Sequence, residues 1–159
     1  MKAKDLARGA LIGALYVLLT LLFAPISSGL AQMRVSEALC VLPCFTFSAV
    51  PGLFIGCLIA NLLTGAAPYD VLFGSLATLL AAIAAWRMRR AGWNRWLMPL
   101  PSVLFNALIV GWLLCYVYAV GVSFPLCALY VGAGQAAACY GLGMPLMSLL
   151  EGYGGRLFR

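Results

Sequence analysis

Long apolar runs separated by short polar breaks follow one another along the chain, and this pattern predicts six helices. The expected helices cover residues 6–24, 35–48, 51–63, 69–86, 96–118 and 126–150. A helix needs about 20 apolar residues to cross a bilayer. The second and third runs are shorter, so we expect them to tilt or to thin the bilayer locally. Pro43 is expected to kink the second helix.

The composition agrees with this pattern and excludes an ordinary soluble domain. Of the 159 residues, 65% are hydrophobic and only 9% are charged, whereas soluble domains carry roughly 25% charged residues. Six spans would occupy nearly the whole chain. We therefore expect an all-α membrane protein with six transmembrane helices and a single domain over residues 1–159.

The net charge of +6 is interpreted as topology and not as nucleic-acid binding. The basic residues form three clusters, which are Lys2, Lys4 and Arg8, then Arg87, Arg89, Arg90 and Arg95, and finally Arg156 and Arg159. With six helices and a cytoplasmic N-terminus, all three clusters lie inside and Arg34 lies outside, as the positive-inside rule requires. This predicts a multi-pass cell-membrane protein with both termini cytoplasmic. Glu151 is expected to form an interfacial ion pair with nearby Arg156.

Five predicted helices each carry one polar group in the outer half or near the midplane. These residues are Glu37, Asn61, Asp70, Asn106 and Gln135. Their shared depth favours a ligand site that faces the outside. A purely structural role is also open, because carboxylates such as Glu37 and Asp70 are favoured in a first helical turn. Asn106 and Gln135 could instead hydrogen-bond between helices.

Arg34 and Glu37 lie at the mouth of an apolar segment, where charged side chains are functional candidates by default. They are three residues apart and would share one face of a helix that begins here. Arg34 could neutralise Glu37 or anchor the loop at the headgroups. We interpret Glu37 as the acceptor at the centre of the ligand site.

The residues that catalysis or a cofactor would need are missing from the sequence. The chain has no His, its six cysteines form no C-x-x-C pair, and no phosphate-binding loop follows a strand. We therefore expect no enzymatic activity, no metal and no cofactor. Cys40 and Cys44 are interpreted as small packing residues.

Small side chains form a stripe along the first predicted helix, at Ala3, Ala7, Ala10 and Ala14. Stripes of this kind let another helix approach closely. The partner could be a helix of the same bundle or a separate protein, and the pattern alone does not distinguish them.

With these residues in view, the chain resembles the QueT family, the proposed queuosine-precursor transporters. The most specific segments are residues 34–39 (Arg-Val-Ser-Glu-Ala-Leu), 51–61 and 70–78. The resemblance implies a substrate-binding S component of an energy-coupling factor (ECF) transporter, with a six-helix bundle of that type. Implied partners are the transmembrane subunit EcfT and two ATPase subunits. The motif Ala10-x-x-x-Ala14 looks like the contact of S components with EcfT, whereas Gln135 departs from the acid that relatives often carry.

The implied ligand is a 7-deazaguanine, such as queuine or one of its precursors. A carboxylate can accept its adjacent N–H donors, and amide side chains can serve the remaining edges. Tyr69, Trp112 or Tyr130 could stack on the ring, and Asp70 could pair with an amine substituent. Two alternatives remain, which are an S component for another vitamin-like ligand and a structural membrane protein without a transport role.

Overall fold

The computed structural model describes residues 3–27 and 34–157, with side chains at 3–25 and 34–153. In these residues the elements are α1 (Ala3–Leu22), α2 (Ala24–Ser27), η1 (Val35–Cys44), α3 (Ala49–Leu63), η2 (Asp70–Gly74), α4 (Ser75–Arg90), η3 (Arg95–Leu97), α5 (Leu100–Trp112), η4 (Leu113–Val117), α6 (Phe124–Ala138), η5 (Cys139–Gly143) and α7 (Met144–Leu157). The segment 28–33 and the side chains of Lys2, Arg156 and Arg159 lie outside the described residues.

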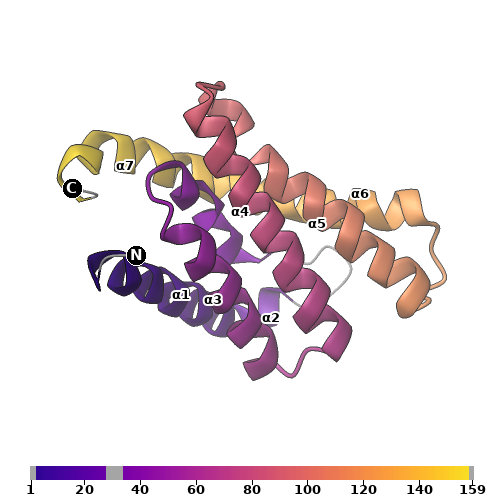
Figure 1. Cartoon of the computed structure of the whole chain (residues 1–159). Helices are drawn as coiled ribbons and strands as arrows, with labels where there is room; N and C mark the ends of the chain where they lie inside the picture. Colours follow the sequence, from indigo (N-terminus) through magenta and orange to yellow (C-terminus); the bar gives the residue numbers. More distant parts are fainter. Residues whose placement is uncertain (1–2, 28–33, 158–159) are drawn as a thin grey trace.

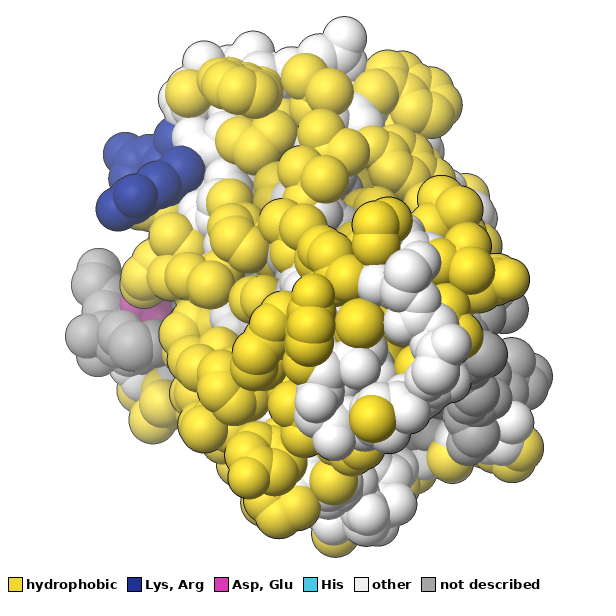
Figure 2. Space-filling view, turned by 90° about the vertical axis from the view of Figure 1, so that its right-hand side faces the viewer, with side chains coloured by type: hydrophobic (Ala, Val, Ile, Leu, Met, Phe, Trp, Pro, Cys, Tyr) yellow, Lys and Arg dark blue, Asp and Glu magenta, His cyan; other side chains and the backbone are white. Residues whose placement is uncertain are grey.

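The helices join into six spans, as the apolar runs predicted. Four are long and apolar enough to cross a membrane, at Ala3–Leu22, Asp70–Arg90, Arg95–Val117 and Phe124–Tyr153. Val35–Cys44 and Ala49–Leu63 are the two shorter apolar helices. Large hydrophobic side chains are exposed around the bundle, and Figure 2 shows one face on which they predominate, with a group of basic side chains at its edge. The chain is thus a multi-pass membrane protein.

Successive spans run in opposite directions between the two ends of the bundle. At one end, Arg89 at the close of α4 and Arg95 in η3 both pair with Glu151 in α7. Gly9 in α1 lies against Ser48, just before α3, at this same end. We call it the basic end, because it holds six of the seven described Lys and Arg side chains, namely Lys4, Arg8, Arg87, Arg89, Arg90 and Arg95. Helix α1 begins and α7 ends on the same side of the molecule (Figure 1).

The segment η1 is the central element, and it differs from the expected α-helix over residues 35–48. It is a 3₁₀-helix that ends at Cys44, with every residue from Ser36 to Pro43 buried. A 3₁₀-helix rises about 2.0 Å per residue, so ten residues cover more of the bilayer than an α-helix of equal length. Pro43 lies inside η1 and has no N–H to donate, and the helix ends one residue later.

Helices α1 and α3 run in the same direction and cross at unusually close range. Gly9 and Gly13 of α1 face Gly52 and Gly56 of α3, each pair spaced four residues apart. A Cβ placed on Gly52 would lie 2.5 Å from the Gly9 carbonyl oxygen. Small residues at this spacing let helix backbones touch. The glycines therefore make α1 and α3 one tightly packed pair.

Candidate functional site

The Glu37 carboxylate lies inside the bundle, bound by hydroxyl groups from two other spans. The Tyr16 hydroxyl of α1 donates to Glu37 Oε1 at 2.6 Å, and the Ser102 hydroxyl of α5 donates to Oε2 at 2.8 Å. The exposed fractions of Tyr16, Glu37 and Ser102 are 1%, 2% and 2%. Both carboxylate oxygens are therefore satisfied without water, which a buried charged group requires.

Local sequence places each of these groups. Glu37 lies in the first turn of η1, where the helix dipole favours a carboxylate. Ser102 lies in the first turn of α5, directly after Pro101. Ser102 lies only seven residues after Arg95, which is at the basic end. Since Ser102 bonds to Glu37, the Glu37 carboxylate lies deeper in the bundle than the outer boundary at which the sequence placed it.

A cavity of about 10 Å³ adjoins the carboxylate, lined by Tyr16, Glu37, Cys40, Leu53, Thr78, Ala81, Ala82 and Ser102. A cavity of this volume accommodates roughly one water molecule. A bicyclic base is much larger, so such a ligand could reach Glu37 only if the surrounding spans moved apart. The lining nevertheless combines a carboxylate with hydroxyl groups, which suits a ligand that carries N–H donors.

A second polar layer lies towards the end opposite the basic end. Arg34 Nη1 donates to Asn61 Oδ1 at 3.0 Å, and Asn61 Nδ2 donates to the Asp70 carbonyl at 3.3 Å. The Tyr118 hydroxyl donates to Asp70 Oδ2 at 2.8 Å. Partial burial and this bond to Asp70 raise the pKa of Tyr118 to about 12. This layer ties α3, η2 and the end of η4 together.

Neutralisation of Glu37 was one of the two roles left open for Arg34, and among the described residues the two side chains form no direct ion pair. Arg34 is extended, with φ −90° and ψ 111°, and precedes η1 as its N-cap, so it shares no helical face with Glu37. The guanidinium turns to Asn61, and the carboxylate turns to Tyr16 and Ser102. The polar residues that the sequence placed in one cluster thus lie in two layers, and the Arg34 guanidinium still interacts electrostatically with Tyr16 and Glu37. We call the layer formed by Tyr16, Glu37 and Ser102 the inner layer. Thr20 lies one helical turn after Tyr16, and Ser36 directly precedes Glu37. The Thr20 hydroxyl donates to the Ser36 hydroxyl at 2.8 Å.

Asn106 and Gln135 are both buried, as predicted for groups near the midplane. Asn106 Nδ2 donates to the Ser102 carbonyl at 2.9 Å, one turn back along α5. Gln135 Oε1 accepts a weak bond from the Cys139 thiol at 3.8 Å, and that thiol also approaches the Glu37 carbonyl at 3.6 Å. Each amide is therefore linked to Glu37 through one intermediate residue, Ser102 for Asn106 and Cys139 for Gln135.

The aromatic side chains proposed for stacking lie on the surface. Tyr69, Trp112 and Tyr130 are 55%, 45% and 44% exposed. The Trp112 ring packs beside Phe73 and Tyr116, with centroids 6.4 and 5.9 Å away. Exposed Trp and Tyr side chains of a membrane protein are often interfacial anchors. Stacking on a ligand stays a prediction for each of them.

Two residues of the inner layer were not identified from the sequence. Tyr16 lies four residues before Thr20 on α1, and Ser102 lies four residues before Asn106 on α5. Each pair is one helical turn apart and marks a polar stripe on an otherwise apolar helix. This spacing could have indicated which faces of α1 and α5 point inward.

The opposite face of α1 borders an apolar groove of about 630 Å³ that is shared with α3. Ala10 and Ala14 line it together with Gly13, Gly52 and Ile55, whereas Ala3 and Ala7 do not. Small residues on α1 therefore have two roles. Gly9 and Gly13 pack against α3, and Ala10 and Ala14 leave a hollow on the outer surface.

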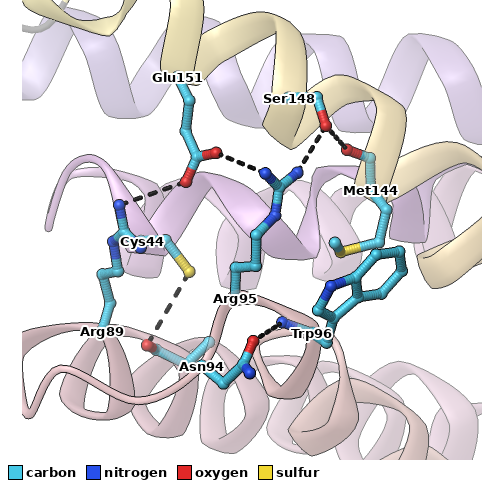
Figure 3. Close-up of polar contacts among 9 residues, drawn as sticks. Cys44, Arg89, Asn94, Arg95, Trp96, Met144, Ser148 and Glu151 are labelled. Carbon is cyan, nitrogen blue, oxygen red and sulfur yellow. Dashed lines mark hydrogen bonds and ion pairs between the residues drawn. The ribbon is translucent and has the colours of Figure 1, made fainter.

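Glu151 forms an ion pair, as predicted, but with partners from the second basic cluster. Its carboxylate lies 3.3 Å from Arg89 Nη2 and 3.2 Å from Arg95 Nη1 (Figure 3). The side chain of Arg156, its predicted partner, lies outside the described residues. The bridge joins the end of α4, the start of η3 and α7 at the basic end.

Comparison with known families shows a match over most of the chain. The family model described as QueT transporter matches residues 6–152, which is nearly the whole chain. No curated protein matches, and no solved structure matches.

Proposed function

The chain belongs to the QueT transporter family, and on that premise we propose that it is the substrate-binding S component of an ECF importer that captures a queuosine precursor. The observation that carries this proposal is the Glu37 carboxylate, buried among spans and held by two neutral hydroxyl donors. Such a group is costly to keep inside a membrane bundle, which makes it a candidate for function by default.

The chemistry of the inner layer supports a 7-deazaguanine as the ligand. The base has two adjacent N–H donors, and Glu37 has two oxygens that already accept two donors. Ring donors would replace the hydroxyls of Tyr16 and Ser102 on the carboxylate. The amides of Asn106 and Gln135 would serve the remaining edges. A base that left these buried groups unpaired would be rejected strongly.

Access to Glu37 is proposed from the end opposite the basic end, past Arg34, Asn61 and Asp70. The Asp70 carboxylate would meet a positively charged substituent on the precursor. Its present partner, the Tyr118 hydroxyl, is half-exposed and neutral, so an amine could compete for that carboxylate. Since the cavity beside Glu37 is about 10 Å³, binding includes separation of the spans around it.

Transport itself is proposed to depend on partners. The groove between α1 and α3 would receive the transmembrane subunit EcfT, with Ala10 and Ala14 at the contact. Two ATPase subunits bound to EcfT would hydrolyse ATP. The basic end would face the cytoplasm, together with both termini, in agreement with the positive-inside rule. An apolar groove on a membrane protein suits a membrane-embedded partner because small residues allow close helix packing.

The test is a titration of the purified protein with queuine, its amine-bearing precursor and guanine, read by calorimetry and by melting temperature. A ligand bound only to the folded state must raise the melting temperature. Saturable binding of a deazaguanine supports the proposal. Mass spectrometry of co-purified small molecules that identifies another vitamin would replace the ligand but keep the S component. No binding and no shift with any of them would favour a structural membrane protein.

A further inference from the structure

Four arginines gather at the turn between α4 and α5, at the basic end. Arg87, Arg89 and Arg90 close α4, and Arg95 opens η3. The Glu151 carboxylate is shared by Arg89 and Arg95, as Figure 3 shows. No other ion pair is formed at this turn within the described residues, so positive charge is in excess.

Hydrogen-bond donors are also in excess at this turn. Arg95 Nη1 pairs with Glu151 and Nη2 donates to Ser148 Oγ at 2.6 Å, but Nε is buried without an acceptor. It is the one buried side-chain nitrogen or oxygen without a partner among residues 3–25 and 34–153. The exposed Arg90 guanidinium stacks on the Trp86 ring, 5.1 Å from its centroid. Stacking leaves the N–H groups along the edge of the guanidinium available.

Exposed aromatic and aliphatic side chains place the turn at the membrane boundary. Trp93 and Trp96 are 53% and 60% exposed, as expected for rings at the headgroup level. On α4, Leu80 and Leu76 are 42% and 37% exposed and lie on the same helical face as Arg87, seven and eleven residues before it. The turn therefore offers guanidinium donors at headgroup depth, next to an apolar surface that continues towards the hydrocarbon.

We propose that the α4–α5 turn binds the phosphate headgroup of an anionic phospholipid. Arg87 and Arg90 would hold the phosphate, since Arg89 and Arg95 are already engaged by Glu151. The planar guanidinium fork matches phosphate oxygens. Basic clusters beside transmembrane helices attract anionic lipids. A lipid fits better than free phosphate because its acyl chains would cover Leu80 and Leu76, which continue the face of α4 that carries Arg87.

The experiment measures lipid retention by the purified full-length protein, using native mass spectrometry with phosphatidylglycerol and phosphatidylcholine. Wild type is expected to retain phosphatidylglycerol preferentially. In the double variant Arg87→Gln/Arg90→Gln that preference should fall by about fivefold for each arginine removed. The matched control is Lys4→Gln/Arg8→Gln, which removes the same charge from the same end and should lower the preference clearly less, because these side chains lie outside the proposed site.

Three results would overturn the proposal. These are equal retention of both lipids by wild type, equal losses in the two double variants, and displacement of phosphatidylglycerol by inorganic phosphate at comparable concentration. Melting temperatures of all variants in phosphatidylcholine separate a folding defect from lost lipid binding. The site lies at the end opposite Asp70 and Arg34, so its outcome does not depend on the proposed transport ligand.

Discussion

The Tyr16 hydroxyl and Glu37 Oε1 lie 2.6 Å apart, and the bond joins α1 to η1 across 21 residues of sequence. Both side chains are buried, so a lost donor leaves the carboxylate oxygen without a protein partner and without contact with bulk water. Tyr16→Phe is therefore expected to lower the free energy of unfolding by about 1–3 kcal/mol, the cost of leaving a buried acceptor unsatisfied. Melting of the purified variant in detergent checks this.

The matched control is Tyr116→Phe, because Tyr116 is 63% exposed. It should melt as wild type does. If the two variants melt alike, the bond to Glu37 contributes nothing measurable to stability.

Glu37→Gln tests the proposed ligand contact. The amide keeps the size of the side chain and one acceptor oxygen, so the helices should still pack. One donor of the base would lose its acceptor, so deazaguanine affinity should fall well over tenfold. A tenfold loss corresponds to about 1.4 kcal/mol of binding free energy. Titration of monodisperse protein measures it, with Asp5→Asn as the charge-matched control. An unchanged dissociation constant would remove Glu37 from the site.

The six spans and their order could be predicted because the thickness of the bilayer fixes how many consecutive apolar residues a span needs. A run of about 20 apolar residues is recognisable without knowledge of its neighbours. The type of η1 could not be predicted in this way. Residues Ser36 to Pro43 are all buried, and a segment buried on every side has no polar face from which a helical period could be read.

Partners of the predicted polar residues depend on which spans are adjacent, and sequence pattern does not supply this. Glu37 and Ser102 are 65 residues apart, yet their side chains bond at 2.8 Å. The spacing of Arg34 and Glu37 predicted a shared helical face, but the Arg34 backbone is extended and its guanidinium donates to Asn61. By contrast, the stripe that contains Ala10 and Ala14 was recognised from spacing, because a helical stripe is a local property. The resemblance to the QueT family then singled out these two alanines.

Ala14→Leu tests the groove between α1 and α3. The larger side chain would fill part of the hollow that Ala14 lines, so a docked helix could no longer approach closely. Ligand affinity of the isolated protein should be unchanged, whereas co-purification with EcfT and uptake of labelled queuine should be lost. Leu11→Phe adds bulk to the same helix at a 72% exposed position outside the groove and should preserve uptake. Uptake that survives Ala14→Leu would assign this alanine to simple packing.

Gly52→Ala tests the close crossing of α1 and α3. The new methyl group would lie 2.5 Å from the Gly9 carbonyl oxygen, which is backbone and cannot turn away. Overpacking of this kind typically costs about 1–3 kcal/mol, and the melting temperature should fall accordingly. Gly152→Ala is the matched control, because nothing lies within 4 Å of a Cβ there. Alanine favours a helix, so the control should melt at or above the wild-type temperature. Equal melting of both variants would contradict the close crossing.

The bond from Tyr118 to Asp70 predicts a late titration at the end opposite the basic end. Partial burial and the 2.8 Å bond raise the pKa of Tyr118 to about 12. A tyrosine in an unfolded chain has a pKa of about 10. Since the folded pKa is the higher one, the stabilising contribution is complete below about pH 10 and is lost as the pH rises towards 12.

The phenolate absorbance of wild type minus that of Tyr118→Phe isolates this group from the other tyrosines. Its midpoint should lie near pH 12 in wild type. In the Asp70→Ala background the midpoint should fall but stay above the ordinary value, because the acceptor is gone while burial, the largest cause of the raised pKa, remains. A wild-type midpoint near the ordinary value would mean that Tyr118 does not hold the Asp70 carboxylate. In that case Asp70 would be free to meet a ligand amine without first releasing a protein partner.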